Sequence, residues 1–376
     1  MNTLYNDVLY LLACAVNKVK ADKNRIESMD LDALYTLCKE HSITALVSYA
    51  LAEHLKEMSS EQYARWSAEQ MKAVYRDMNF AAERANILSF LEENGIWYMP
   101  LKGIILKEYY PRAELREFAD NDILFDADFE KQVEQYMLSH GYQRKLSDSG
   151  QVMEYEKAPC FNFEMHRALY HPNNTVLYAY YKDVKERLIK DSDNAFGYHF
   201  SEEDFYVFMI SHALKHYKNS GIGIRFLIDI YVYNRAKSAT MDTEYIAREL
   251  EKIEADAFES EMRMLAQTAF GTEDADFTPE QENILEYVFQ AGTYGTADIL
   301  AQNRMKNKIG TVDTSPAGRR RYWANRLFDM ERCKVEYPRI YKTKILIPFL
   351  ILFRAIKGLT KIKSIKEENE NLKKLQ

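Results

Sequence analysis

Three carboxylates in the middle of the sequence have the spacing of a metal site. Asp120 and Asp122 are two residues apart, so both side chains leave the same face if this segment is a strand. Glu164 lies on the polar face of a second candidate strand, residues 160–167. If the two strands are neighbours, the three carboxylates converge, and because like charges repel, such a cluster usually holds cations. Oxygen ligands favour Mg²⁺ or Mn²⁺. The alternating residues of the second strand are Phe161, Phe163 and Met165 on one face, and Asn162, Glu164 and His166 on the other.

Lys102 and Gly103 form a candidate phosphate site. Gly103 lies where an apolar, aromatic strand at 96–99 turns into a helix. Without a Cβ its backbone can approach a phosphate, the helix N-terminus offers free N–H groups, and Lys102 adds a positive charge. A phosphate site followed by an Asp-x-Asp strand fits metal-assisted nucleotidyl transfer. Each motif alone is common, and their combination and order carry the prediction.

The hydrophobic pattern around these residues predicts a small α/β core between two helical regions. Apolar residues recur at intervals of three and four before Asn94-Gly95, which is a typical helix end. Ser201 and Asp204 form a helix-start box, and the pattern is helical again beyond them. We therefore expect an α+β, mostly helical fold, with a small mixed sheet flanked by N- and C-terminal helical lobes. The expected strands are 96–99, 122–125, 151–157 and 160–167, and the helices between them are 103–110 and 128–139. The expected regions are 1–94, 95–190, 191–341 and a basic tail at 342–376.

Composition excludes several classes of protein. The chain has 376 residues, of which 47% are hydrophobic, and only 13 Gly and 8 Pro, which excludes collagen-like and disordered chains. Four cysteines lie far apart, so neither a disulfide framework nor a zinc site is expected. Residues 11–14 resemble a lipoprotein cleavage box, but the basic leader is missing, so we interpret residues 3–17 as an amphipathic helix and expect a cytoplasmic protein.

Charge is distributed unevenly along the chain. Residues 1–300 carry 31 basic and 50 acidic side chains, whereas residues 301–366 carry 17 basic and 4 acidic ones. An anionic partner would therefore meet the C-terminal part, although a solvated helical surface explains the charge equally well. We expect the apolar stretch from Ile345 to Ile356 to pack on the protein's own helices. Membrane-surface contact through 342–366 and nucleic-acid contact are alternatives, and the latter rests on charge alone.

Residues 99–125 resemble the uncharacterised bacterial nucleotidyltransferases that have the DNA-polymerase-β-type fold. That family has Leu-Lys-Gly, a short helix, an Arg four residues before an Asp-x-Asp, and then an apolar strand, and Arg116 precedes Asp120 by four. His140-Gly141-Tyr142, the segment 164–167 and the N-terminal residues around His41 also fit. The helical segments His212-Ala213-Leu214-Lys215-His216 and Arg225 to Asp229 match further family motifs. The resemblance covers about residues 30–235 and implies that Glu164 is the third carboxylate.

Two departures from the family pattern concern packing and phosphate binding. Asn121 stands inside the Asp-x-Asp motif, where the family usually has an apolar residue facing the core. The turn at 102–103 is Lys-Gly, whereas better-known nucleotidyltransferases have Gly-Ser or Gly-Gly. This difference weakens the prediction that the turn binds a triphosphate.

The helical motifs allow more than one interpretation. His212, Lys215 and His216 share one helix face, which could close over a nucleotide, hold zinc, or carry two histidines of a packed helix. The sequence lacks the Glu of an H-E-x-x-H zinc motif. Arg225 and Asp229 are four residues apart, which indicates either a structural ion pair or a phosphate contact by Arg225.

Together these features predict a metal-dependent nucleotidyltransferase. It would move a nucleoside monophosphate from an NTP, such as ATP, to a hydroxyl of an unknown small molecule or protein, with release of pyrophosphate. A catalytically silent nucleotide-binding or regulatory module is the alternative. Asp120, Asp122 and Glu164 would hold Mg²⁺ or Mn²⁺. Because Asp122→Asn relieves repulsion among them, we expect the metal-free variant to be as stable as the parent or slightly more stable. The expected nucleotide and phosphate contacts are Lys102, Gly103, Arg116, His166, His212, Lys215, His216 and Arg225.

Overall fold

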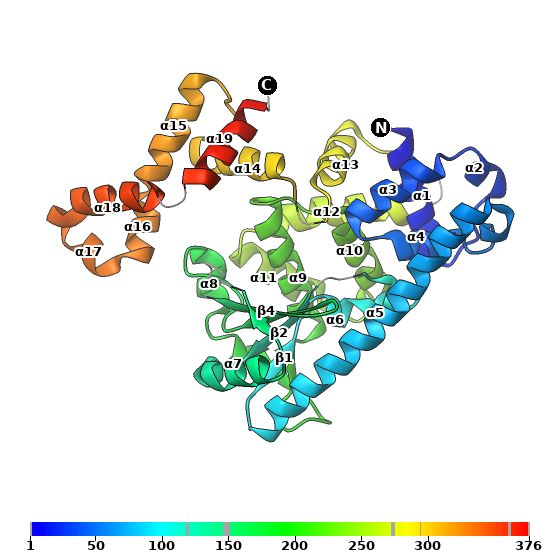
Figure 1. Ribbon diagram of the computed structural model, residues 1–376, viewed down its shortest axis with the longest axis horizontal. Helices are drawn as coiled ribbons and strands as arrows, with labels where there is room; N and C mark the ends of the chain where they lie inside the picture. The colour runs from blue at the N-terminus through cyan, green and yellow to red at the C-terminus, as the bar shows by residue number, and fades with distance from the viewer. Residues whose placement is uncertain are drawn as a thin grey trace.

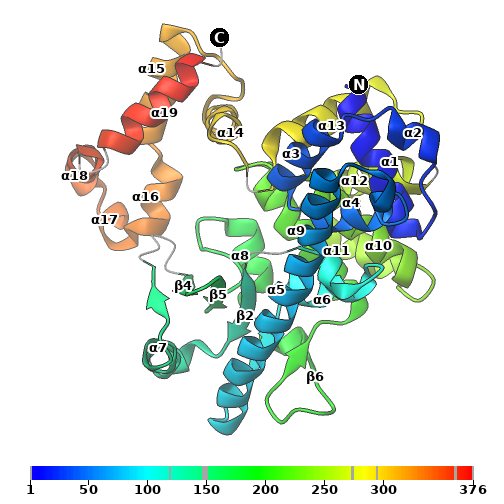
Figure 2. The ribbon, with the colours of Figure 1, turned by 45° about the vertical axis from the view of Figure 1, so that its right-hand side comes forward.

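The chain is mostly helical around one small sheet (Figures 1 and 2). The computed structural model describes residues 2–117, 120–145, 151–271, 275–293, 295–359 and 362–374. The strands are β1 Tyr98–Pro100, β2 Asn121–Phe125, β3 Gln143–Arg144, β4 Val152–Lys157, β5 Phe161–His166, β6 Ile189–Lys190 and β7 Tyr198–His199. The four strands expected from the sequence therefore form, and this α+β, mostly helical architecture confirms the expected fold class.

The sheet that positions the carboxylates has the strand order β1-β2-β5-β4-β3. β2 and β5 are parallel, and the other neighbours are antiparallel. β6 and β7 form a separate antiparallel pair. Every residue of β2 is buried, which fits a central strand covered on both faces. The mixed sheet therefore brings two strands that are distant in sequence into direct contact.

One face of the sheet is covered by α5 (Ser60–Glu93) and α7 (Glu130–Ser139). The alternation expected for residues 160–167 is present, because Phe161, Phe163 and Met165 are buried in this layer. Asp126 accepts a hydrogen bond from the Asp128 backbone N–H and caps the turn before α7. The apolar side of β5 is thus fixed by packing, and its polar side is left for other contacts.

The N-terminal helices share a hydrophobic core with helices that follow the sheet. In α1 every residue from Val8 to Val16 is buried, so the expected helix at 3–17 forms but is covered all round rather than amphipathic. It packs on α4 and α12. Ser201 caps α9 through the Asp204 N–H, as its sequence predicts. The helices are α1 Thr3–Asn17, α2 Lys23–Glu27, α3 Leu31–His41, α4 Thr44–Leu51, α6 Gly103–Leu106, α8 Thr175–Tyr181, α9 Glu202–Tyr217, α10 Ile224–Lys237, α11 Thr243–Lys252, α12 Asp256–Gly271 and α13 Pro279–Ala291.

The C-terminal helices form a separate arm with a small core of their own (Figure 1, orange to red). The expected packing of 345–356 on the protein is wrong for most of the segment, because only Leu350 is buried within it. Helix α18 contacts α15, α17 and α19, and these contacts leave Phe349, Leu352, Phe353 and Ile356 exposed. Within the described ranges we find no helix with the length and hydropathy needed to cross a bilayer. The remaining helices are α14 Ala297–Ile309, α15 Pro316–Leu327, α16 Met330–Glu336, α17 Pro338–Lys342, α18 Ile347–Leu359 and α19 Ile362–Lys374.

Candidate active site

The parallel pairing of β2 and β5 places two of the predicted carboxylates side by side. Asp122 is opposite Glu164 in the register, and Leu124 is opposite His166. Side chains of adjacent strands that share a face are neighbours, so Asp122, Glu164 and His166 gather on the polar face of the sheet. One ligand atom from each lies within 4.8 Å of the others. The convergence expected from strand periodicity is therefore present for Asp122 and Glu164, and His166 joins them within this distance where Asp120 was expected.

Asp122 is the best-compensated carboxylate of the group. Its Oδ1 accepts hydrogen bonds from Lys102 Nζ at 2.5 Å and from His166 Nε2 at 2.8 Å. Burial alone would raise the pKa of Asp122, but the Lys102 ammonium and the His166 hydrogen bond hold it well below its usual range. Conversely, burial would lower the pKa of His166, and its hydrogen bonds to Asp122 and Glu164 raise it instead. Asp122 is thus held ionised between two donors.

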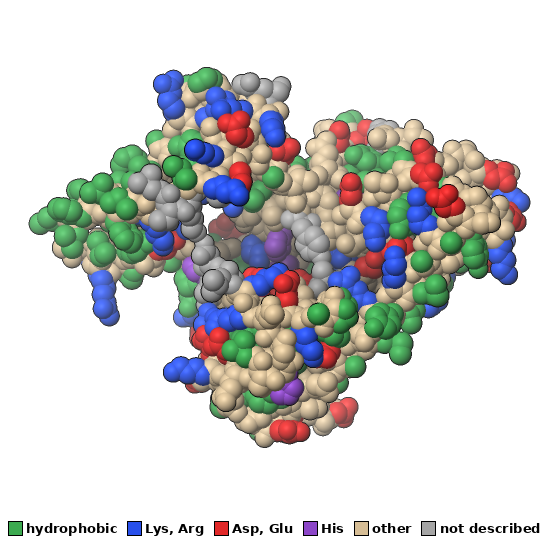
Figure 3. All heavy atoms as spheres, in the orientation of Figure 1, with side chains coloured by type: hydrophobic (Ala, Val, Ile, Leu, Met, Phe, Trp, Pro, Cys, Tyr) green, Lys and Arg blue, Asp and Glu red, His purple; other side chains and the backbone are tan. Residues whose placement is uncertain are grey.

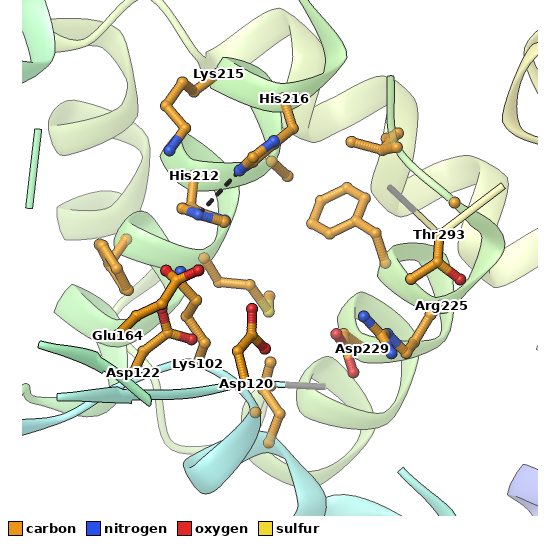
Figure 4. Close-up of a pocket in the computed structure, with 18 of the residues that line it drawn as sticks. Lys102, Asp120, Asp122, Glu164, His212, Lys215, His216, Arg225, Asp229 and Thr293 are labelled. Atoms are coloured by element: carbon orange, nitrogen blue, oxygen red, sulfur yellow. Dashed lines mark hydrogen bonds and ion pairs between the residues drawn. The ribbon is translucent and has the colours of Figure 1, made fainter. Parts of the chain in front are cut away.

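Asp120 has a different environment, although it precedes β2 by one residue. Figure 4 shows its side chain pointing into the same cavity as those of Asp122 and Glu164. Burial, followed by the negative charge of Asp122, raises the pKa of Asp120 to about 6. The group of ligand atoms within 4.8 Å found among the described residues contains His166 in place of Asp120. The surrounding protein therefore compensates the negative charge of Asp120 less well than that of Asp122.

The turn between β1 and α6 brings Lys102 to Asp122. The backbone of Lys102 has φ 50° and ψ −114°, a conformation that non-glycine residues rarely adopt. The left-handed residue of this turn is thus Lys102 and not Gly103, which begins α6. Such backbone strain, typically about 1–3 kcal/mol, tends to persist at functional sites. Here the strained turn brings the ammonium group of Lys102 to the Asp122 carboxylate.

Helix α9 forms the opposite wall with three basic side chains. His212 and His216 contact each other through their Nε2 atoms at 3.2 Å (Figure 4). Burial and then nearby positive charges, among them Lys102, lower the pKa of His212 far below its ordinary value and that of His216 to about 3. Burial and Lys102 lower the pKa of Lys215 to about 8. The sequence placed these residues on one face, and the structure turns that face toward the carboxylates.

Arg116, expected as a phosphate contact, is instead paired with Asp229, whereas Arg225 takes the second of its two expected positions and lines the cavity. Asp229 does not pair with Arg225, as the sequence spacing had suggested, because the guanidinium of Arg116 binds both of its carboxylate oxygens. Asp229 outweighs burial and raises the pKa of Arg116. Arg225 instead donates to the backbone carbonyl of Glu117 and lines the cavity. Tertiary packing thus overrides an i,i+4 spacing that was compatible with a local pair.

All the predicted site residues line one cavity of about 430 Å³, between the sheet and helices α9 and α10. Space-filling atoms show a hollow at the centre of this face, with blue, red and purple side chains inside (Figure 3). Sequence reasoning missed Gln151, Thr293 and the segment 220–223, which also line it. Apolar side chains complete the wall: Leu106, Val152, Phe205, Phe208, Met209, Ile222 and Phe226. A mixed lining of this kind is typical of small-molecule sites, whose volumes run from roughly 300 to 1,000 Å³.

The segment 220–223 enters the cavity because two glycines allow close packing. Gly221 has φ +97°, and a Cβ there would lie 2.9 Å from Ala291 Cβ. A Cβ on Gly223 would lie 2.5 Å from the carbonyl oxygen of Gly292. The repeated glycines just before Arg225 were the sequence signal that could have identified this segment.

Asn121, the departure from the family pattern, has a partner in α5. Its Oδ1 accepts a hydrogen bond from Arg84 at 2.7 Å, and its side chain is fully buried. Its Nδ2 has no hydrogen-bond partner among the residues described. Burial lowers the pKa of Arg84. A polar residue in a core position is thus explained by a buried arginine that needs an acceptor.

The donor atoms fit a divalent cation. Asp122 and Glu164 offer carboxylate oxygens and His166 an imidazole nitrogen, and this combination suits Mn²⁺ as well as Mg²⁺. Asp120 carries a negative charge that a cation would compensate. The alternative of a zinc site at His212 and His216 is not supported, because no further ligand joins that pair within the described ranges.

Comparison with known proteins points to one family. The family described as uncharacterised nucleotidyltransferase matches residues 27–271. No curated protein matches the chain. Among solved structures, the chain is similar to the lincosamide antibiotic adenylyltransferase LnuA in its lincomycin-bound form, at 15% identity and a TM-score of 0.25. That similarity covers 46% of this chain and 96% of the other, and it is too weak to carry an argument about fold or substrate.

Proposed function

The chain belongs to the uncharacterised nucleotidyltransferase family, and on that premise we propose that it moves a nucleoside monophosphate from an NTP to a hydroxyl group, with release of pyrophosphate. The observation that supports this most is the register of β2 and β5, which sets Asp122 beside Glu164 opposite the basic face of α9. Carboxylates on one wall and cations on the other suit a metal-bound triphosphate.

In this proposal the carboxylate wall holds the cation. Asp122 and Glu164 would be ligands, with Asp120 joining them because its own charge is poorly compensated. His166 is a further candidate donor. A bound Mg²⁺ or Mn²⁺ would supply charge neutralisation and Lewis-acid stabilisation of the phosphoryl oxygens.

The basic wall would hold the triphosphate. Lys215, half-buried and with its ammonium on the cavity side, is the main candidate for a phosphate contact, and Lys102 and Arg225 are others. His212 and His216 are neutral near pH 7, since their pKa values are depressed, so they would donate single hydrogen bonds rather than charge. Arg116 is committed to Asp229 and would act by positioning the loop before Asp120.

The remaining step of the proposed reaction is activation of the acceptor hydroxyl group. The acceptor hydroxyl oxygen forms a bond to the α-phosphorus as the bond from that phosphorus to the bridging oxygen of pyrophosphate breaks. Glu164, about a quarter exposed, would orient the hydroxyl and take its proton. The apolar part of the cavity, around Phe208 and Phe226, would receive a nucleobase or a small acceptor rather than a macromolecule.

The test is a screen of the four NTPs for pyrophosphate release with Mg²⁺ or Mn²⁺ and a library of hydroxyl compounds. We expect turnover by the parent and by Asp128→Asn, an exposed carboxylate outside the cavity, and none by Asp122→Asn. Binding of an NTP without turnover for any acceptor would favour the silent nucleotide-binding module. Failure of every NTP to bind would overturn both.

A further inference from the structure

Helix α18 presents an apolar face to solvent, which is unusual for a segment that contacts the rest of the chain. Ile345 is 83% exposed and Phe349 67% exposed, whereas Leu350 is 2% exposed on the opposite side. Arg354 also points inward, donating to the Arg326 and Asp329 carbonyls. The exposed residues are Ile345 and Leu346, in the turn just before α18, and Phe349, Leu352, Phe353 and Ile356 within the helix.

These residues form one continuous stripe. Phe349, Leu352, Phe353 and Ile356 follow the spacing of a single helix face. Figure 3 shows the result as a dense group of hydrophobic side chains at the left extremity, where Figure 1 places α17 and α18. Contiguous apolar patches of this kind mark binding surfaces. We call the six exposed residues the α18 face.

The charge around the α18 face restricts what could cover it. From residue 337 to 366 the sequence has eight Lys or Arg and no Asp or Glu. Arg339 and Lys342, before the α18 face in sequence, and Lys363 and Lys366, after it, have exposed side chains. A second copy of the chain docking through the same face would bring these cations together, and a nucleic acid offers nothing for the apolar centre.

We propose that the α18 face is a docking surface for an anionic lipid membrane. The apolar side chains would enter the boundary between headgroups and acyl chains, and the flanking lysines and arginines would meet the negative headgroups. A helix of 13 residues is too short to span the bilayer, so it would lie in the interface plane.

The position of this surface is compatible with an active cavity. In both ribbon views the α17–α18 end of the C-terminal arm lies at the periphery, whereas β2, β5 and α9, which carry the cavity, lie centrally (Figures 1 and 2). Docking through the α18 face would therefore leave the cavity open, and the proposal stands or falls independently of nucleotidyl transfer.

The experiment measures co-sedimentation of the full chain with vesicles of phosphatidylcholine, with and without phosphatidylglycerol. We expect binding to the vesicles that contain phosphatidylglycerol and weak binding to phosphatidylcholine alone. Phe349→Glu with Leu352→Glu should weaken binding at least roughly tenfold. The matched control is Met71→Glu with Met78→Glu, on the exposed side of α5, which should bind like the parent.

A second variant and a mass measurement separate the alternatives. Lys342→Glu with Lys366→Glu leaves the apolar face intact and should weaken binding to anionic vesicles roughly tenfold or more. No binding of the parent to anionic vesicles would overturn the proposal. Light scattering that shows a parent dimer, and a monomer for Phe349→Glu with Leu352→Glu, would instead assign the α18 face to a second copy.

Discussion

Arg116 and Asp229 form a buried two-point ion pair that ties the loop before β2 to helix α10. Arg116 Nε lies 2.8 Å from Asp229 Oδ1, and its second nitrogen lies 2.7 Å from Oδ2. Tyr110 also donates to Asp229 at 2.7 Å. Arg116 and Asp229 both line the cavity that Asp120 enters, so the pair lies at the wall of the candidate site. The pair therefore links the segment before β2 to helix α10, which also carries Arg225.

Removing one partner of this pair should be costly. In Asp229→Asn the buried guanidinium of Arg116 loses its counter-charge, and we expect the free energy of unfolding to fall by about 3–5 kcal/mol. Urea denaturation followed by circular dichroism measures this. Glu53→Gln, which removes a fully exposed partner of Lys20, is the matched control and should leave the denaturation midpoint unchanged. Equal midpoints for all three proteins would contradict a stabilising role for the pair.

Replacement by Asn should change the free energy of unfolding in opposite directions at Asp120 and at Asp122. Repulsion among carboxylates suggested that Asp122→Asn would leave stability unchanged or slightly increased, but Lys102 and His166 both depend on its charge. We therefore expect Asp122→Asn to cost about 2–3 kcal/mol in metal-free buffer. Asp120→Asn should be neutral or stabilising above pH 6. Denaturant titrations of the two variants in a chelating buffer compare them.

The pH dependence of the Asp120→Asn variant tests whether ionisation of Asp120 opposes folding. The folded-state pKa of about 6 exceeds the ordinary value of 3.8, so ionisation of Asp120 opposes folding as pH rises between these values. The variant Asp120→Asn should thus exceed the parent in free energy of unfolding by its full amount above pH 6, and this difference should vanish toward pH 4. An advantage that grows on acidification would contradict the assignment.

Nucleotide affinity should depend on the protonation of Lys215. Its pKa of about 8 means that the ammonium is present near pH 7 and lost as pH rises beyond 8. If Lys215 contacts phosphate, affinity for the NTP should fall roughly tenfold between pH 7 and 9.5. Lys215→Arg should flatten the profile because arginine stays charged. Lys218→Arg, at an exposed position of the same region, is the control, and calorimetric titration is the measurement.

His41 should make the fold sensitive to mild acid. It lies between α3 and α13, with Nε2 3.1 Å from the Phe289 carbonyl, and burial lowers its pKa to about 4. The unfolded chain binds a proton near pH 6.5, so stability contributed by neutral His41 is lost as pH falls from 6.5 to 4, at about 1.4 kcal/mol per unit. His41→Gln should show a shallower slope in denaturation at several pH values. Parallel slopes would rule this out.

Local patterns in the sequence predicted the elements of the fold and part of the site. Alternation along β5 identified the side that carries Glu164, and the Ser201 cap marked the start of α9. These features depend on residues a few positions apart, which a periodicity registers directly.

Contacts between distant segments were beyond such patterns. The pairing of Arg116 with Asp229 depends on how a loop meets α10, and an i,i+4 spacing suggested Arg225 instead. The outward face of α18 is a similar case. An apolar stripe on a helix predicts that this face packs against a partner, but it does not identify the partner. The entry of Gly221 and Gly223 into the cavity likewise depends on α13 and the turn after it.

The shared core of α1 and α12 has a consequence for synthesis on the ribosome. Asn17, at the end of α1, donates a hydrogen bond to the carbonyl of Phe270, 253 residues later. The buried run from Val8 to Val16 thus emerges long before α12, which covers it, has been translated. A nascent chain with an uncovered apolar segment is prone to aggregate and is a natural client for chaperones. Helix α4 can cover one side of α1 soon after both have been made, whereas the side that packs on α12 stays uncovered until residue 271 has emerged during elongation.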